Sequence, residues 1–195
     1  MLKMILLAVV VATALVLYLT LSLDVFPQMY QSIEPRRPEA LITDVSLSTP
    51  IISLGQNFVI SVTGTNRGDE ADMQIVSVGF PNLTRTENIE VLAQNFMQTP
   101  RIIDKGDHIG SEYSGTERQV NAQYPSVEAS SRPWAAGSTY NIDLKVKPDA
   151  EGRFAVFVKS IAFPHSWDGA HWPHEGVRDY QKEWVQVYYV QVTKP

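Results

Sequence analysis

Residues 140–160 have the sequence YNIDLKVKPDAEGRFAVFVKS, which carries the clearest β-strand pattern in this chain of 195 residues. In its first part, apolar and polar side chains alternate, and a period of two predicts a strand with one buried face. The apolar positions are Ile142, Leu144 and Val146. The following PDAEG segment is typical of a turn. Residues 153–162 are then apolar on both faces, which predicts a central strand.

The same texture continues on both sides of this hairpin. Four more strands are predicted from alternation or from β-branched and aromatic content, over residues 41–48, 56–65, 74–80 and 184–192. After the second of these, Asn66-Arg67-Gly68-Asp69 is typical of a turn, because Asn and Gly tolerate positive φ. No long amphipathic helix is evident. Short strands separated by turns predict an all-β fold, an antiparallel β-sandwich.

Two stretches resemble a known family. Gly55–Glu70 (GQNFVISVTGTNRGDE) has a glycine, an alternating strand and an Asn-x-Gly turn, and Tyr140–Ser160 joins two long strands through a charged turn with Gly. Both are similar to immunoglobulin-like modules of the CARDB type, which are common on archaeal and bacterial cell surfaces. The resemblance implies an immunoglobulin-like β-sandwich and a surface adhesion role, and it brings no catalytic residues.

The N-terminus carries an apolar run from Met4 to Leu23 without a charged residue, preceded by Lys3 and closed by Asp24. Twenty helical residues at about 1.5 Å each span roughly the 30 Å hydrocarbon core of a bilayer. We expect an uncleaved transmembrane signal-anchor, with the N-terminus cytoplasmic because Lys3 precedes the span. The alternative is a signal peptide cleaved after about Ser22.

These features divide the chain into three parts. Residues 1–24 are the predicted anchor helix, 25–40 a Pro-containing linker, and 41–195 the extracytoplasmic β-sandwich. Residues 94–137 form a polar, turn-rich insertion within that domain, and an insertion of this length is typically a functional loop or disordered. We therefore expect a single-pass protein of the cell membrane.

Charge and cysteine content exclude several classes of protein. Lys3 is the one charged residue before Asp24, so the remaining chain has 15 basic and 21 acidic residues and a formal net charge of −6. That balance argues against nucleic-acid partners, which need clustered Lys and Arg. The chain has no cysteine, which excludes disulfides, thiolate catalysis and Cys-based metal sites.

The stretch Phe163–Tyr180 (FPHSWDGAHWPHEGVRDY) concentrates residues that can carry chemistry. Its imidazoles, His165, His171 and His174, are suited to copper or zinc. Their spacing matches no established ligand signature, however, so no cofactor is required. The alternatives are an exposed aromatic binding loop and ordinary loop packing.

Tryptophans offer a second kind of site. Trp167 and Trp172 lie in the same stretch, and Trp134 follows Arg132-Pro133; together they are candidates for binding a sugar ring or the apolar surface of a partner. The competing interpretation is that these rings close the ends of the sandwich core. Asn82-Leu83-Thr84 is a candidate N-glycosylation sequon with Asn82 as the acceptor.

No nucleophile motif is present, because Gly-x-Ser-x-Gly is missing and no His stands among candidate nucleophiles. We therefore expect no enzyme. The favoured function is binding, as an accessory subunit of a membrane or envelope complex or as an adhesion module, with contacts supplied by residues 94–137 and 163–182. The alternatives are an extracytoplasmic copper- or zinc-binding protein and a structural envelope or filament subunit.

Overall fold

The computed structural model describes residues 11, 13–15, 18, 37–113, 117–164 and 177–195, without the side chains of 110–119. The chain divides into two compact units, 1–35 and 36–195. The described residues of the first unit are helical. Within the described part of the chain, no helix is both long and apolar enough to cross a membrane. Most of the predicted anchor, and residues 25–36 of the predicted linker, lie outside the described residues.

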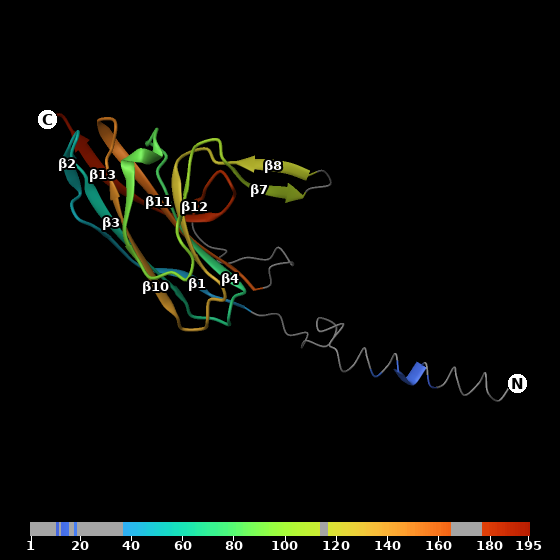
Figure 1. Cartoon of the computed structure of the whole chain (residues 1–195). Helices are drawn as coiled ribbons and strands as arrows, with labels where there is room; N and C mark the ends of the chain where they lie inside the picture. The colour runs from blue at the N-terminus through green and yellow to red at the C-terminus, as the bar shows by residue number, and fades with distance from the viewer. Residues whose placement is uncertain (1–10, 12, 16–17, 19–36, 114–116, 165–176) are drawn as a thin grey trace, which may run out of the picture. The chain divides into compact units, whose positions relative to one another are not determined.

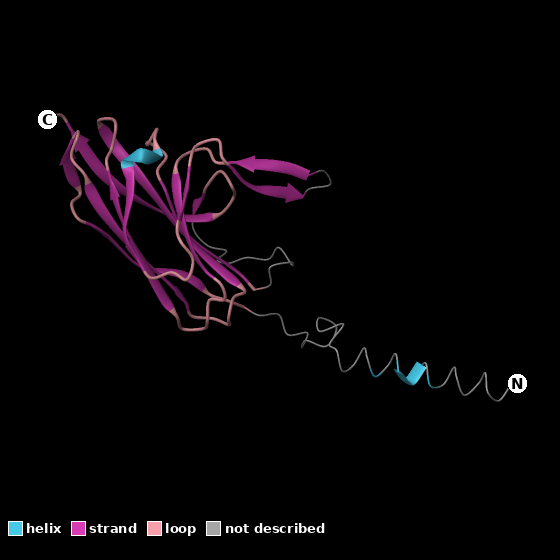
Figure 2. Ribbon diagram, in the orientation of Figure 1, coloured by secondary structure: helices cyan, strands magenta, loops and turns pink. Residues whose placement is uncertain are grey.

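The second unit is a sandwich of two sheets whose strands are antiparallel, apart from one parallel pair (Figures 1 and 2). The four-stranded sheet has the order β1-β3-β10-β5, and the seven-stranded sheet has the order β12-β13-β11-β4-β9-β6, with β2 paired in parallel to β13. The strands of the first sheet are β1 (Ala40–Leu47), β3 (Phe58–Asn66), β5 (Ile89–Gln94) and β10 (Thr139–Val146). Those of the second are β2 (Ile51–Ser53), β4 (Met73–Gly79), β6 (Arg101–Ile103), β9 (Ser126–Ser131), β11 (Gly152–Phe163), β12 (Val177–Arg178) and β13 (Trp184–Thr193).

The core lies between the two sheets, where alternate residues of each strand point inward. In β3, Phe58, Ile60 and Val62 are buried, and the residues between them are only half-buried. β11 lies between β13 and β4, as the apolar run predicted for a central strand. The prediction of an all-β sandwich is confirmed, and each strand predicted from pattern is present with its ends shifted by at most two residues.

Residues 94–137, predicted as a polar insertion, contain strands that belong to the sandwich. They supply two strands of the seven-stranded sheet, β6 and β9, and between these a separate hairpin of β7 (His108–Tyr113) and β8 (Glu117–Asn121). The hairpin projects away from both sheets (Figure 1). β9 was missed because its buried positions are small or hydroxylated: Val127 and Ala129 face the core, and Ser131 is buried as well. Such a strand carries little hydrophobic signal.

The turn after β3 requires a glycine at position 68 for a reason that the sequence pattern did not reveal. Gly68 does not have a positive φ; instead, a Cβ there would come within 2.1 Å of the Arg37 carbonyl oxygen. Buried Asn66 organises the same turn: its Oδ1 accepts from the amides of Glu39 (3.0 Å) and Gly68 (3.1 Å). Close approach of two backbone segments therefore requires the glycine here.

Candidate functional site

A row of polar side chains crosses the outer face of the seven-stranded sheet. Strand register places Lys159 on β11 beside Ser77 on β4, Ser77 beside Glu128 on β9, and Glu128 beside Arg101 on β6. The neighbouring residues on each of the first three strands face the core, so these side chains point away from it. Lys159 nevertheless has only 7% of its surface exposed. Something must therefore cover this face.

The cover over Lys159 is the turn that joins β12 to β13. The Lys159 ammonium donates to Asp179 Oδ2 at 2.8 Å and to Gln181 Oε1 at 2.6 Å. Asp179 Oδ1 in turn accepts from the amides of Gln181 (2.8 Å) and Glu183 (3.0 Å). The Asp179 side chain is 1% exposed, so this is a buried ion pair. The additional hydrogen bonds, from Lys159 to Gln181 and from the two amides to Asp179, stabilise both charges in this buried position.

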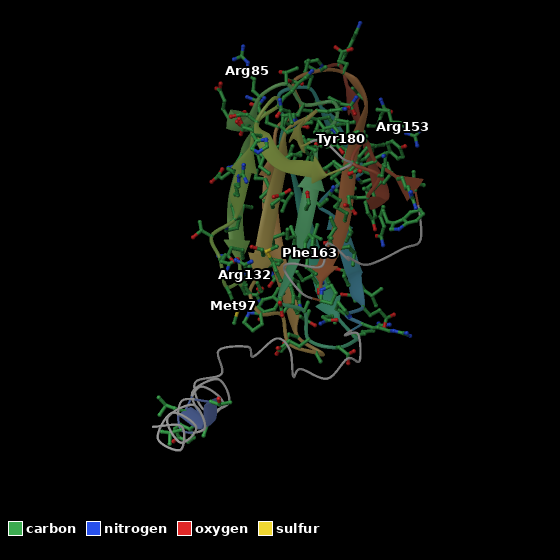
Figure 3. The ribbon with its side chains drawn as sticks, turned by 90° about the vertical axis from the view of Figure 1, so that its right-hand side faces the viewer. Arg85, Met97, Arg132, Arg153, Phe163 and Tyr180 are labelled. Atoms are coloured by element: carbon green, nitrogen blue, oxygen red, sulfur yellow. The ribbon has the colours of Figure 1, made fainter. Side chains whose placement is uncertain are left out.

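A second part of the cover comes from the segment that joins β8 to β9. Tyr124 lies over Gly79 of β4, where an added Cβ would come within 2.6 Å of the ring. The ring meets Phe157 of β11 edge to face at 5.7 Å and Tyr180 at 5.2 Å between centroids. Figure 3 shows Tyr180 on this side of the domain.

These groups surround a small pocket with room for about one water molecule. Its lining includes Tyr124, Glu128, Lys159 and Asp179. The full lining is Ser77, Gly79, Ile109, Tyr124, Ser126, Glu128, Phe157, Lys159, Asp179, Tyr180, Gln181 and Val185. The two segments that the sequence analysis singled out, 94–137 and 163–182, thus meet at one pocket.

The ionisable groups of the pocket are perturbed by their burial. Loss of solvent raises the pKa of the Glu128 carboxyl, and the positive charges of Lys159 and Arg101 act in the opposite sense. Burial also raises the pKa of Tyr124 and Tyr180, and the negative charge of Asp179 adds to both shifts. Both tyrosines are therefore neutral hydroxyl groups at ordinary pH.

Among the predicted site residues, Trp134 is described and lies inside the core. It is fully buried, donates from Nε1 to the Ser138 carbonyl at 2.9 Å, and packs edge to face on Phe96 and Tyr140. The ring thus closes one end of the core, as the competing interpretation held, and presents no surface to a ligand. The residues His165, His171, His174, Trp167 and Trp172 lie outside the described residues, so their proposed roles stay predictions.

The sequon is found at the surface in the turn after β4. Asn82 is exposed, and its Oδ1 accepts from the amide of Ala155 at 2.8 Å. The Thr84 hydroxyl donates to Asp149. Glycosylation of Asn82 stays a prediction.

In the described part of the chain, no group of three His, Asp or Glu side chains is placed to hold a metal ion.

The sequence analysis missed the residues that line the pocket. One signal was present: Lys159 is the one charged residue in the apolar run FAVFVKSIAF, and a lysine that is buried there requires a partner. Asp179, twenty residues later, gave no local sign of being that partner.

No protein-family model matches the chain, and no curated protein sequence matches it. Among solved structures, a CARDB domain from Pyrococcus furiosus is 11% identical, covers 83% of this chain and 92% of that chain, and has a TM-score of 0.39. A cohesin module of a Clostridium perfringens family 33 glycoside hydrolase is 9% identical, covers 82% and 99%, and has a TM-score of 0.35. A β-glucosidase from Erythrobacter marinus is 10% identical, and the match covers 80% of this chain but 16% of the enzyme, with a TM-score of 0.39. The chain is an all-β sandwich that resembles CARDB and cohesin domains at low sequence identity.

Proposed function

We propose that the protein is a binding module, held at the outer face of a cell membrane by its N-terminal segment, that serves as an accessory subunit of a membrane or envelope complex. The observation that supports this most is the meeting of the two covering segments. Residues from 94–137 and from 163–182 enclose one pocket on a single face, with Tyr124 against Tyr180. Tyrosine side chains are enriched at protein contact surfaces.

The opposite face of the domain offers a contrast. On the outer face of the four-stranded sheet, β3 and β10 present small hydroxyl residues such as Thr65 and Thr139, whose hydroxyls lie 3.0 Å apart. Thr43 of β1 joins the same row. Threonine pairs are ordinary stabilising contacts across strands and supply no aromatic anchor. The partner is therefore expected on the face that carries the pocket.

Site-directed photo-crosslinking in intact membranes tests this proposal. A photoreactive residue replaces Val177 on β12, which is 63% exposed, and in a matched variant it replaces Ile51 on β2, which is 60% exposed. β2 lies well away from the β7–β8 hairpin in Figure 1. We expect a discrete adduct from position 177 that is weaker when Tyr180→Ala is added, and none from position 51. Equal labelling from both positions, or no adduct from 177, would contradict the proposed contact face.

The membrane anchor is tested separately. The full chain is expected to stay in the membrane pellet after an alkaline wash, and a chain that begins at Asp24 is expected to be released. Mass spectrometry of the membrane-bound protein should find the original N-terminus. A mature N-terminus near residue 23 would establish the cleaved signal peptide instead.

A further inference from the structure

The pocket separates two opposite charges that are not in direct contact. Lys159 on β11 and Glu128 on β9 both line it, and Ser77 on β4 lies between them in the strand register. Neighbouring strands are about 4.8 Å apart, so the two backbones are roughly 10 Å apart. The Lys159 ammonium is bound by Asp179 and Gln181, and within the described residues no ion pair joins it to Glu128.

The charges on the two sides of the pocket offset one another. Arg101 on β6 stands opposite Glu128 in the strand register, and Lys159 is paired with Asp179. The order of charges across the sheet, from β6 to the covering turn, is therefore positive, negative, positive, negative. Such a row has no net charge that would select an ion, so a neutral and polar occupant fits the space at its centre.

The size and the walls of the pocket match a single water molecule, for which the free space has room. The Lys159 ammonium has three N–H donors, of which two are already used in hydrogen bonds. The Glu128 carboxylate adds an acceptor, and the Ser77 hydroxyl can donate or accept. A buried water typically makes about three hydrogen bonds, and these three groups supply them. The rings of Tyr124 and Tyr180 also line the pocket and shield it from bulk solvent.

We propose that this pocket is a binding site for one ordered water molecule, which accepts a hydrogen bond from Lys159 and donates one to Glu128. The Ser77 hydroxyl is its third partner. The water thereby links Glu128 to the buried pair of Lys159 and Asp179, and so connects β9 to the covering turn. This goes beyond the proposed function, because it assigns the pocket to solvent. A partner on this face then contacts the outer surface of the covering segments and does not enter the pocket.

A crystal structure of the full chain tests the proposal directly. We expect a water molecule within about 3.2 Å of Lys159 Nζ and of one Glu128 carboxylate oxygen. Magnetic relaxation dispersion of the water oxygen counts long-lived waters in solution, and it is measured on the full chain in a maltoside detergent. It should detect the same water. A metal ion or a buffer molecule in its place would contradict the assignment to solvent.

Ser77→Val is the variant that removes the site. The valine methyl groups fill the pocket and displace the water, which leaves Lys159 and Glu128 each short of a hydrogen bond. We expect one long-lived water fewer and a melting temperature lower by a few degrees. Ser61→Val is the matched control, because Ser61 is half-buried on β3 and does not line the pocket. It should lose no water and should not lower the melting temperature, since valine favours strands. Glu128→Gln keeps an acceptor oxygen and should keep the water.

Three outcomes would overturn the proposal: no water in the pocket of the wild type, an equal number of long-lived waters in the wild type and Ser77→Val, or a higher melting temperature for Ser77→Val. The crystal structure needs no variant, so it remains decisive even if a substitution impairs folding. None of these measurements involves a partner. Their failure would therefore leave the crosslink from position 177 unaffected, and a missing crosslink would leave the water site unaffected.

Discussion

Two lysines on consecutive strands, β10 and β11, each pair with a carboxylate, and the two pairs have opposite surroundings. Lys145 on β10 pairs with Glu90 on β5 at the outer face of the four-stranded sheet, where the two side chains are 39% and 57% exposed. Lys159 on β11 pairs with Asp179 at the outer face of the seven-stranded sheet, where the exposures are 8% and 1%. Both lysines point away from the core; the difference is the cover over the second face.

The covering segments change how strongly a lysine–carboxylate pair stabilises the fold. When an ion pair is exposed to water, it adds little to the free energy of unfolding, because solvent screens both charges. Under the turn at 179–183 and the ring of Tyr124, the same charges have lost their water and depend on each other. The buried pair therefore ties the covering turn to the sheet, beside the pocket that Glu128 and the two tyrosines line.

The largest effect should come from breaking the buried pair. Lys159→Met leaves Asp179 buried without its partner and is expected to lower the free energy of unfolding by about 3–5 kcal/mol. Urea denaturation followed by circular dichroism measures the loss. Adding Asp179→Asn should recover most of it, because Asn removes the charge and keeps an acceptor for the amides of Gln181 and Glu183. A loss that persists in the double variant would show that the charge pair is not its cause.

Displacing the aromatic cover should have the next largest effect. Gly79→Ala places a Cβ 2.6 Å from the Tyr124 ring, which must then move away from Phe157 and Tyr180. We expect a loss of about 1–3 kcal/mol in thermal or urea unfolding. In a Tyr124→Ala background the same substitution should cost much less, because the clash is gone. Additive losses would mean that Gly79 is needed for another reason.

Glu128→Gln should act in the opposite direction. Burial raises the pKa of Glu128 in the folded state, so the folded protein holds the proton more tightly than the unfolded chain does. Stability due to this group is then present at low pH and is lost as the pH rises through the interval between the two pKa values. The variant should be more stable than the wild type at pH 7 and equal to it at about pH 4. Unfolding curves at the two pH values measure the difference, and a gain that is equal at both would exclude titration of Glu128 as its source.

The smallest effect should come from the open face. Lys145→Met removes the exposed pair with Glu90 and is expected to change the free energy of unfolding by less than about 1 kcal/mol. The change should shrink further in 1 M salt, which the Lys159→Met effect should resist. A loss as large as that of Lys159→Met would mean that cover does not distinguish the two pairs.

The sequence analysis succeeded where pattern is local. Alternation along β3 and β10, and the unbroken apolar run of β11, predicted strands that the structure contains. It failed where the strand is short or its buried residues are small, as in β6 and β9. It also described β11 as apolar on both faces, although the outward face carries Lys159.

The candidate site was predicted in outline only. Residues 94–137 and 163–182 were named as contact segments, and the described parts of both reach the pocket. The individual residues named were different ones: Trp134 is a core residue, and the histidine cluster lies outside the described residues. Glu128, Tyr124 and Asp179 carry no motif, because each depends on a neighbour that is distant in sequence.

The sequence by itself determined the class of the fold, since a period of two in hydrophobicity is a property of consecutive residues and selects a sheet with one buried face. It also determined the absence of disulfides and thiol chemistry, because there is no cysteine. Only the tertiary structure decided which face of which sheet is covered, and hence which lysine is buried. That outcome depends on the register of four strands and on a turn twenty residues from Lys159. Burial in turn strengthens the electrostatic interactions between the charges that this turn covers.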